Sequence, residues 1–169
     1  MWQVAVCGPG ECTPQEAEAA RDVGRLLAGR GVVVLCGGYG GVMAAAAAGA
    51  REAGGVVVGV LSGRDRAGAS SDLTVALPTG LGEARNALIV RAADAVVVVG
   101  GSWGTLSELA LARRGGTPVI TLGGWRILDA EGRPVPGPVA AAGPAEAVRL
   151  ALAAAERARP LSGGERLRP

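Results

Sequence analysis

The sequence predicts a single α/β domain, built as a three-layer, doubly wound and mostly parallel sheet of the Rossmann-like kind. Strand-length apolar runs alternate with helix-length segments along the chain, which is typical of parallel α/β folds. The strand runs are continuously apolar rather than alternating, as in strands that are covered on both faces. Several of these runs end in a glycine-rich turn that leads into a helix, the place where such sheets bind their ligands.

The first half of the chain predicts three strands and two helices. Thr13 is a suitable N-cap for the first helix, and Pro14 suits its first helical position. The second helix is rich in alanine, whose small side chain permits close packing on the sheet. Right-handed crossovers place the three strands in the order 3-2-1. The strands are expected at 2–7, 32–36 and 56–61, and the helices at 14–28 and 42–53.

The alternation weakens after the third strand, because residues 62–72 are polar, contain glycine and suit an exposed loop. If a short fourth strand extends the side of the third, the next strand lies beside the first. The loops after Cys7 and Val99 then flank the switch point of the sheet, where ligands bind in doubly wound folds. The remaining elements are expected as strands at 73–77, 95–99 and 118–122, helices at 81–93, 105–113 and 144–157, and a loop at 123–138.

Length and composition limit the class of protein. At 169 residues the chain fits one domain, expected at 1–158, followed by a frayed C-terminal tail at 159–169. Phe is absent, so the core has to be built from Val, Leu, Ile and Ala. The net charge of +2 is too small to favour a nucleic-acid partner. No apolar run is long enough for a membrane span and no signal peptide is recognisable, so we expect a soluble, cytoplasmic protein without a membrane partner.

Two missing residue types exclude several enzyme classes. The chain contains no His, and its 17 basic residues are all Arg. Without Lys it forms no Schiff base with pyridoxal phosphate, which excludes a pyridoxal-dependent decarboxylase, and it has no P-loop lysine. Cys7, Cys12 and Cys36 lack the spacing of a zinc site, so we expect reduced thiols and no metal site. The use of Arg in place of Lys also fits a thermophilic source.

The stretch at 94–112 is the one around which the site is organised. It predicts a buried strand, a turn that contains Gly100 and Gly104, and a helix that begins near Thr105. Thr105 is expected as the N-cap, with Glu108 three residues later as in a capping box. The first N–H groups of this helix and its dipole then favour an anion in the turn, most often a phosphate.

Other interpretations of the glycine-rich turns are a plain connection, a hydrolase and a dehydrogenase. Residues 100–104 match the G-x-S-x-G nucleophile elbow, but the chain has neither His nor Lys to activate the serine. A dehydrogenase site calls for an acidic residue after the second strand, where Cys36 and Gly37 stand. We therefore expect a crevice for a phosphorylated nucleotide, without a required cofactor. The candidate phosphate- and nucleotide-binding residues are Gly8, Gly10, Gly38, Gly40, Gly41, Asn86, Gly100, Gly101, Ser102, Gly104 and Thr105.

Arg85 and Glu108 are the candidate reactive side chains. Arg85 lies near the start of the helix before the central strand, and Glu108 lies one turn inside the next helix. The planar fork of an arginine binds phosphate or ribose oxygens, and a carboxylate activates water or stabilises positive charge. The alternatives are a solvated helix face for Arg85 and a purely capping role for Glu108.

Three segments resemble a known family. Residues 100–108, GGSWGTLSE, resemble the PGGxGTxxE motif of the LONELY GUY (LOG) family, also labelled lysine decarboxylase-like. Residues 81–88, LGEARNAL, look like its Arg-Lys segment, and residues 37–48 are similar to its GGGxxGLMGAxA stretch. The resemblance covers about residues 4–122, with the spacing of the motifs kept.

The resemblance implies a Rossmann-like homodimer, or a higher homo-oligomer, that binds nucleoside 5′-monophosphates. Active members cleave the N-glycosidic bond of cytokinin riboside monophosphates, through a ribosyl cation that a carboxylate stabilises. Carried over, Arg85 and Glu108 are the catalytic pair, and Gly101, Gly104 and Thr105 hold the phosphate.

Three departures from the motif separate this chain from the active members. Asn86 stands in place of the family's Lys, Gly100 replaces its Pro, and a bulky Trp103 lies inside the turn. The chain therefore resembles a divergent branch, related to DprA/Smf-like proteins and to molybdenum-cofactor carrier proteins. The alternative to N-glycosidic hydrolysis is a non-catalytic carrier or sensor of a nucleotide-like cofactor such as the molybdenum cofactor.

Overall fold

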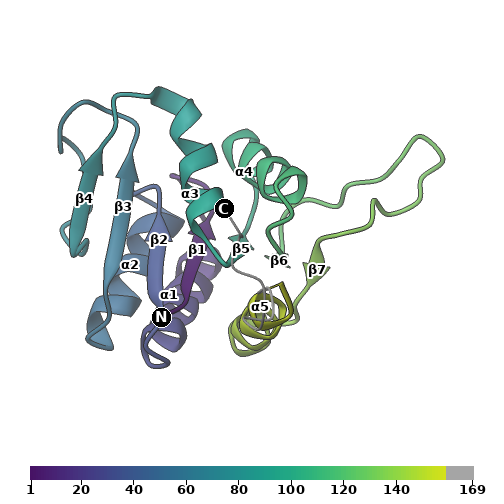
Figure 1. The fold of residues 1–169 in the computed structure, drawn as a ribbon, viewed down its shortest axis with the longest axis horizontal. Coiled ribbons are helices and arrows are strands. Elements are labelled where there is room, and N and C mark those ends of the chain that lie inside the picture. Colours follow the sequence, from purple (N-terminus) through teal and green to yellow (C-terminus); the bar gives the residue numbers. More distant parts are fainter. Residues whose placement is uncertain (159–169) are drawn as a thin grey trace, which may run out of the picture.

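Seven strands form one sheet in the computed structural model, which describes residues 1–158 (Figure 1). The order is β4-β3-β2-β1-β5-β6-β7, and neighbouring strands pair in parallel throughout. The predicted 3-2-1 order and the position of the fifth strand beside the first are confirmed. The tail predicted at 159–169 lies outside the described residues. The strands are β1 Gln3–Cys7, β2 Val33–Cys36, β3 Val57–Leu61, β4 Val75–Pro78, β5 Ala95–Val99, β6 Val119–Leu122 and β7 Val139–Ala140.

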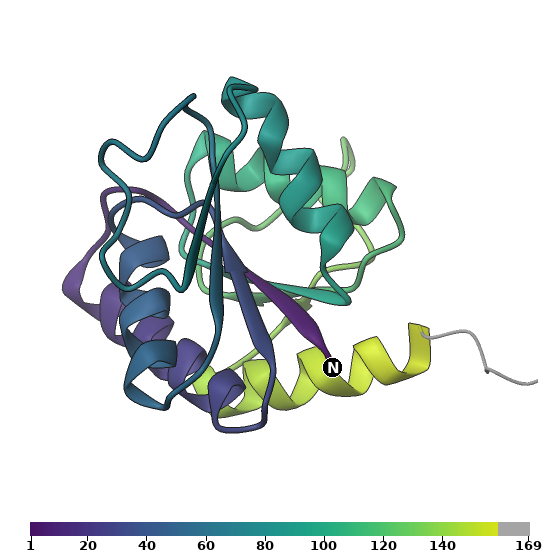
Figure 2. The ribbon, with the colours of Figure 1, turned by 60° about the vertical axis from the view of Figure 1, so that its left-hand side comes forward.

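Helices cover both faces of the sheet, as a doubly wound fold requires (Figures 1 and 2). Val4 and Val6 of β1 share a core with α1, α2 and α5 on one face. Ala5 and Cys7 share the opposite core with α3 and α4, because successive strand side chains point to opposite faces. The described helices are α1 Pro14–Ala28, α2 Val42–Glu52, α3 Asn86–Ala92, α4 Trp103–Arg114, α5 Pro144–Ala158 and the short 3₁₀ helix η1 Gly82–Arg85.

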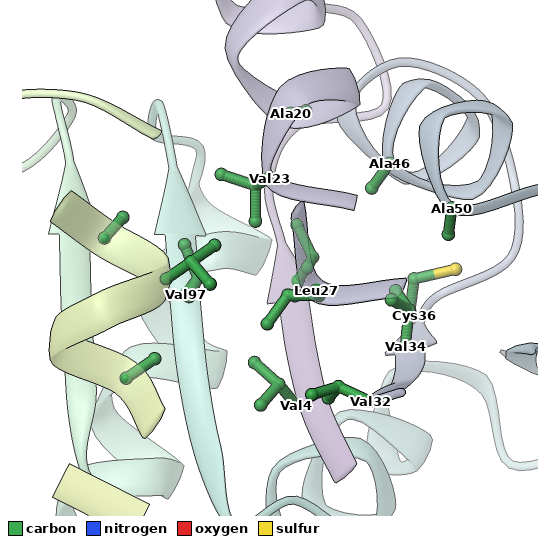
Figure 3. Packing of buried hydrophobic residues seen from close by; sticks show 14 of the residues in the cluster. Val4, Ala20, Val23, Leu27, Val32, Val34, Cys36, Ala46, Ala50 and Val97 are labelled. Atoms are coloured by element: carbon green, nitrogen blue, oxygen red, sulfur yellow. The ribbon is translucent and has the colours of Figure 1, made fainter. Parts of the chain in front are cut away.

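Close packing of α1 against α2 holds the two turns that follow β1 and β2. A Cβ added to Gly24 would collide with the Ala46 carbonyl, and one added to Gly49 would collide with the Arg21 carbonyl. Val23 of α1 fills the space between this helix and the sheet (Figure 3). Gly24 and Gly49 thus permit backbone contact between the helices. The close packing on the sheet that the alanine-rich composition of α2 predicted is seen at Ala46 and Ala50, which are buried in the core that α2 shares with the sheet.

The predicted cap of α1 is confirmed. The Thr13 hydroxyl accepts a hydrogen bond from the Glu16 N–H at 3.2 Å, and the Glu16 carboxylate accepts one from the Thr13 N–H at 2.9 Å. This reciprocal capping box satisfies two of the open N–H groups at the start of the helix. It also holds the Glu16 carboxylate at the edge of the sheet where the turns gather.

The start of α4 differs from the prediction. The helix begins at Trp103, and its N-cap is Ser102, whose hydroxyl accepts a hydrogen bond from the Thr105 N–H at 3.2 Å. The capping box predicted between Thr105 and Glu108 is therefore wrong. Both Ser102 and Thr105 are good cap residues, but Ser102 has the extended backbone of an N-cap, with φ −141°.

Two further elements differ from the expected ones. The helix expected at 81–93 divides into η1 and α3. Gly82 has a φ of +54°, outside the helical region, so regular α-helix does not begin at residue 81. The two-residue strand β7 inside the stretch after β6 was not predicted, since two residues carry no periodic signal.

The segment between β6 and β7 extends away from the sheet as an arm (Figure 1). Its two limbs meet at an antiparallel bridge between Leu128 and Pro134. The polar loop predicted at 62–72 is confirmed, since this segment contains neither helix nor strand. Within residues 1–158, no helix has the length and apolarity needed to cross a membrane.

Candidate functional site

The glycine-rich turns after β1 and β2 are in contact at the carboxyl edge of the sheet. The Val42 N–H donates to the Pro9 carbonyl at 3.0 Å, and a Cβ added to Gly40 would lie 3.3 Å from the Gly10 carbonyl. Gly41 has a φ of +61°, and a Cβ there would collide with the Pro9 carbonyl. Gly41 is therefore needed, and Gly40 is favoured, because backbone meets backbone here.

The turn after β5 joins the same edge. A Cβ added to Gly8 would collide with the Val42 side chain and lie 2.6 Å from the Val99 carbonyl. Gly100, with φ +65°, donates its N–H to the Leu122 carbonyl at 3.1 Å, which ties the turn to β6. The loops after β1 and β5 therefore flank the switch point of the sheet, as predicted.

The amino end of α4 has open backbone donors. Ser102 takes up two of the helix's first amides, the Thr105 N–H through its hydroxyl and the Leu106 N–H through its carbonyl. The N–H groups of Trp103 and Gly104 have no acceptor within residues 1–158. Their dipoles and that of the helix make this end attractive to an anion.

Glu16 limits where such an anion can sit. Its carboxylate lies against Gly100, where an added Cβ would collide with the carboxylate oxygen. Two donors from Thr13, the N–H and the hydroxyl, already bind this carboxylate at 2.9 and 3.1 Å. Like charges repel, so the part of the turn that suits an anion is 101–105.

Asn86 binds α4 rather than the crevice. Its amide Nδ2 donates to the Ser107 hydroxyl at 3.0 Å, and that hydroxyl donates to the Gly104 carbonyl at 2.7 Å. Asn86 is 6% exposed, so its side chain is a buried brace between the start of α3 and the first turn of α4. It thereby positions the turn that was predicted to bind phosphate.

Arg85 brings a positive charge to the end of β2 and β3. Its Nη1 donates to the Val60 carbonyl at 3.0 Å, and its guanidinium lies where a Cβ on Gly37 would be. Its Nε is buried and has no hydrogen-bond partner within the described residues. A buried, unpaired guanidinium N–H is costly unless a ligand or water accepts from it.

Glu108 is a buried carboxyl on the second turn of α4. It is 7% exposed and interacts with the Cys7 thiol at the end of β1. Burial raises the pKa of Glu108 to about 7, although the positive charge of Arg85 and the Cys7 hydrogen bond both lower it in part. None of the ion pairs within residues 1–158 joins Arg85 to Glu108, so the two interact across a gap.

The cysteines are free and those in the sheet are poor nucleophiles. Burial, followed by the nearby Glu108 charge, raises the pKa of Cys7 well above its usual range. Burial likewise raises the pKa of Cys36 to about 11. A thiol that stays protonated at neutral pH serves as a hydrogen-bond donor and not as an attacking group.

Gly38 packs against β3. Its φ is +81°, and a Cβ there would collide with the Leu61 side chain and lie 3.1 Å from the Gly59 Cα. The lack of a side chain at Gly38 therefore accommodates the packing of β3 and the loop that follows it. The structure places this residue against β3 rather than against the turn at 101–105.

Two indoles lie beside the turn, one of which the sequence analysis did not single out. Trp125, on the segment after β6, donates its indole N–H to the Ser102 carbonyl at 3.1 Å, and its ring packs on Gly101. The centroids of the Trp103 and Trp125 rings are 5.3 Å apart, with the planes tilted by 41°. Trp103 is 78% exposed, so it stands beside the turn and does not bury it.

Cys7 and Trp125 were missed for different reasons. Cys7 ends the first strand at the predicted switch point, and that position is a usable signal. Trp125 carries no local signal, because it returns to the turn from the far side of β6.

A doubly wound parallel sheet with glycine-rich turns gathered at its switch point defines a Rossmann-like, nucleotide-binding class of protein. The chain belongs to the SLOG cluster4 family, whose model matches residues 1–143. The resemblance to the LOG-like superfamily, drawn from three sequence segments, is thereby confirmed.

Several relatives share most of their length with this chain. The molybdenum cofactor binding protein of Rippkaea orientalis is 34% identical, with a TM-score of 0.82 over 90% of this chain and 96% of that one. The molybdenum cofactor carrier protein of Chlamydomonas reinhardtii is 31% identical, with a TM-score of 0.79 over 90% and 97%. An uncharacterized protein of Archaeoglobus fulgidus is 42% identical over 136 residues, 76% of this chain and 89% of the relative.

A more distant likeness is to a DNA processing protein. DNA processing protein A of Streptococcus pneumoniae is 22% identical, with a TM-score of 0.66 over 88% of this chain and 61% of that one. At this identity the likeness concerns the fold alone.

Proposed function

We propose that this chain binds and carries a phosphorylated, nucleotide-like cofactor, with the phosphate at the turn between β5 and α4. The observation that carries the proposal is the pair of backbone N–H groups at Trp103 and Gly104, which have no acceptor within residues 1–158. They lie at a helix N-terminus and at the switch point of the sheet, which both favour a phosphate.

The molybdenum cofactor is the cargo that the relatives favour. The proteins at 34% and 31% identity are named as binding or carrying it. The residues of this chain fit such an anionic group, because the open amides and the unpaired Nε of Arg85 supply donors without any Lys. A carrier binds and releases its cofactor without changing it and so needs no reactive group. The cofactor would therefore be cargo and not a catalytic group of this chain.

Material that is released when the purified protein is denatured tests this proposal. Mass spectrometry is expected to find one phosphorylated pterin or nucleotide per chain, chemically unchanged. The apoprotein is then expected to take up molybdenum cofactor released from a donor enzyme. Absence of a phosphorylated ligand, together with failure to take up the cofactor, would count against the proposal.

Gly104→Ala tests whether the phosphate binds at the amides of this turn. A Cβ added there has only the Ser102 hydroxyl nearby, at 3.8 Å, so the fold tolerates it. The methyl group would stand where a phosphate approaches the amides, and we expect cofactor uptake to fall. Gly143→Ala is the control, because a Cβ there meets nothing within 4 Å and it lies next to α5.

Hydrolysis of a nucleoside 5′-monophosphate is the second candidate function. It is favoured by one observation, the electrostatic coupling of Arg85 with a Glu108 whose pKa is raised to about 7. A carboxyl with such a pKa is suited to proton transfer near neutral pH. Release of ribose 5-phosphate from a panel of nucleoside monophosphates, abolished by Glu108→Gln, would establish it. Binding without product would leave the carrier function.

A further inference from the structure

The Trp103–Trp125 pair is unusual for this chain. The sequence contains three Trp, one Tyr and no Phe, and two of the three Trp stand side by side at one turn. Trp103 is 78% exposed, so its ring contributes little to the core. An exposed indole at the first position of a helix has no role in capping, which Ser102 already performs.

The pair belongs to the turn itself. The Trp125 indole N–H holds the Ser102 carbonyl at 3.1 Å, and the Trp125 ring packs on Gly101, where a Cβ would lie 2.8 Å from it. Trp103 directly follows Ser102 and supplies one of the open amides. The same backbone segment therefore presents hydrogen-bond donors for a phosphate and an aromatic wall, formed by the rings of Trp103 and Trp125.

The ring of Trp103 is exposed, follows the open amides in the chain and lies with its centroid 5.3 Å from that of Trp125. Indole faces stack on flat heteroaromatic rings through dispersion and their π-systems. In a phosphorylated nucleotide or pterin, only a few bonds separate the phosphate from such a ring. A phosphate anchored at 101–105 therefore keeps its ring within the neighbourhood of this wall.

We propose that Trp103 stacks on the planar heteroaromatic ring of the bound ligand, and that Trp125 positions it. This assignment rests on the proposed function and adds the chemical class of the ligand: a phosphate joined to a flat, fused or single heterocycle. Binding then depends on two separate contributions, one from the amides to the phosphate and one from the indole to the ring.

Two probes separate these contributions. GMP has both the phosphate and a planar ring, and ribose 5-phosphate has the phosphate without the ring. Calorimetric titration of the full chain is expected to find that GMP binds about ten- to a hundredfold more tightly, the usual effect of stacking one base on an aromatic side chain. Trp103→Leu is expected to remove most of this advantage and to leave the affinity for ribose 5-phosphate unchanged.

Two variants complete the test. Trp103→Phe is expected to recover part of the preference for GMP, because a phenyl ring also stacks. Trp2→Leu is the matched control, since Trp2 precedes β1 at the opposite edge of the sheet and is expected to leave both affinities unchanged. Trp125→Leu is expected to weaken the GMP preference less than Trp103→Leu does.

The outcomes distinguish this inference from the proposed function. If the wild type binds neither probe, the proposed function fails and the stacking role fails with it. If the wild type binds ribose 5-phosphate as tightly as GMP, or if Trp103→Leu weakens both equally, only the stacking role is overturned. A change of molar mass in light scattering on Trp103→Leu, with GMP affinity unchanged, would instead assign the pair to a contact between copies of the chain.

Discussion

The thiol of Cys7, at the end of β1, interacts with the buried carboxyl of Glu108 on the second turn of α4, and this interaction raises the pKa of the thiol and lowers that of the carboxyl. This contact joins the first strand of the sheet to the helix whose amino end carries the open amides. It also places a thiol beside Glu108 where water is largely excluded, since the residue is 7% exposed. Cys7 therefore favours the ionised form of a carboxyl whose burial, the larger effect, favours the protonated form.

Replacing Cys7 should raise the pKa of Glu108 still further. The thiol donates to the ionised carboxylate, and loss of a donor to the charged form disfavours ionisation. In Cys7→Ala we expect the Glu108 pKa above the value of about 7 that the native environment produces. Carbon-13 NMR titration of the side-chain carboxyls measures it directly. Cys12→Ala, at a partly exposed cysteine outside the sheet, should leave the Glu108 titration unchanged.

The contribution of Glu108 to the stability of the fold should fall as the pH rises from about 4.5 to about 7. The pKa of Glu108 is raised from 4.5 to about 7 by folding, so the native state holds a proton that the unfolded state releases in this window. The free energy of unfolding is then expected to drop by roughly 3 kcal/mol from this group. Below pH 4.5 and above pH 7 the contribution is flat.

Glu108→Gln isolates that contribution, because glutamine keeps the shape and the acceptor but does not ionise. Urea unfolding measures the free energy of unfolding of wild type and Glu108→Gln at pH 5 and pH 8. Relative to the wild type, the variant should be more stable at pH 8 than at pH 5. An equal difference at the two pH values would mean that Glu108 titrates near its ordinary value.

Gly41→Ala should destabilise the fold more than Gly54→Ala. Both residues have positive φ, +61° and +72°, so alanine is strained at each. A Cβ on Gly41 also collides with the Pro9 carbonyl, whereas a Cβ on Gly54 meets nothing within 4 Å. We expect a loss of about 1 kcal/mol for Gly54→Ala and at least twice that for Gly41→Ala. The urea midpoint of Gly54→Ala reports the backbone strain alone, and the further loss in Gly41→Ala reports the collision with Pro9.

Asn86 and Ser107 should be energetically coupled. The amide of Asn86 donates to the Ser107 hydroxyl at 3.0 Å, and both hold the first turn of α4. A double-mutant cycle of Asn86→Ala and Ser107→Ala is expected to give a coupling energy of about 0.5–1.5 kcal/mol in unfolding free energy. Additive effects would show that the Asn86–Ser107 hydrogen bond does not brace α4.

The sheet was predictable because its determinants are local. Continuous apolar runs mark covered strands, and right-handed crossovers fix the order once the strands are known. The errors arose where two local signals compete, as at Ser102 and Thr105, which are both good N-caps. Only the extended backbone at Ser102 decides between them, and that conformation depends on the strand before it.

The site was predictable only in part, for a geometric reason. Glycine-rich turns after parallel strands must share one edge, so the meeting of the turns after Cys7, Cys36 and Val99 follows from the sequence. Side-chain partners depend on register and on helix rotation. The thiol of Cys7 reaches Glu108, and Trp125 returns to Gly101, through packing that no spacing in the sequence encodes.

Arg85→Lys should weaken phosphate binding although it keeps the positive charge. Arg85 holds the Val60 carbonyl through Nη1 at 3.0 Å while its buried Nε has no partner within the described residues. The guanidinium thus offers one N–H to the protein and another to a ligand, and an ammonium group on a flexible stem cannot reproduce this fork. We expect the affinity for ribose 5-phosphate to fall about tenfold, equivalent to one lost charge-assisted hydrogen bond.

Arg91→Lys is the matched control for this prediction, since Arg91 is exposed on the last turn of α3. Calorimetric titration with ribose 5-phosphate should leave its affinity at the wild-type value. Unfolding free energies of both variants, measured in urea, show whether Arg85→Lys has also lost the contact with Val60, which is worth about 1 kcal/mol. Equal phosphate affinity in wild type, Arg85→Lys and Arg91→Lys would remove Arg85 from the binding site and leave it as a brace for β3.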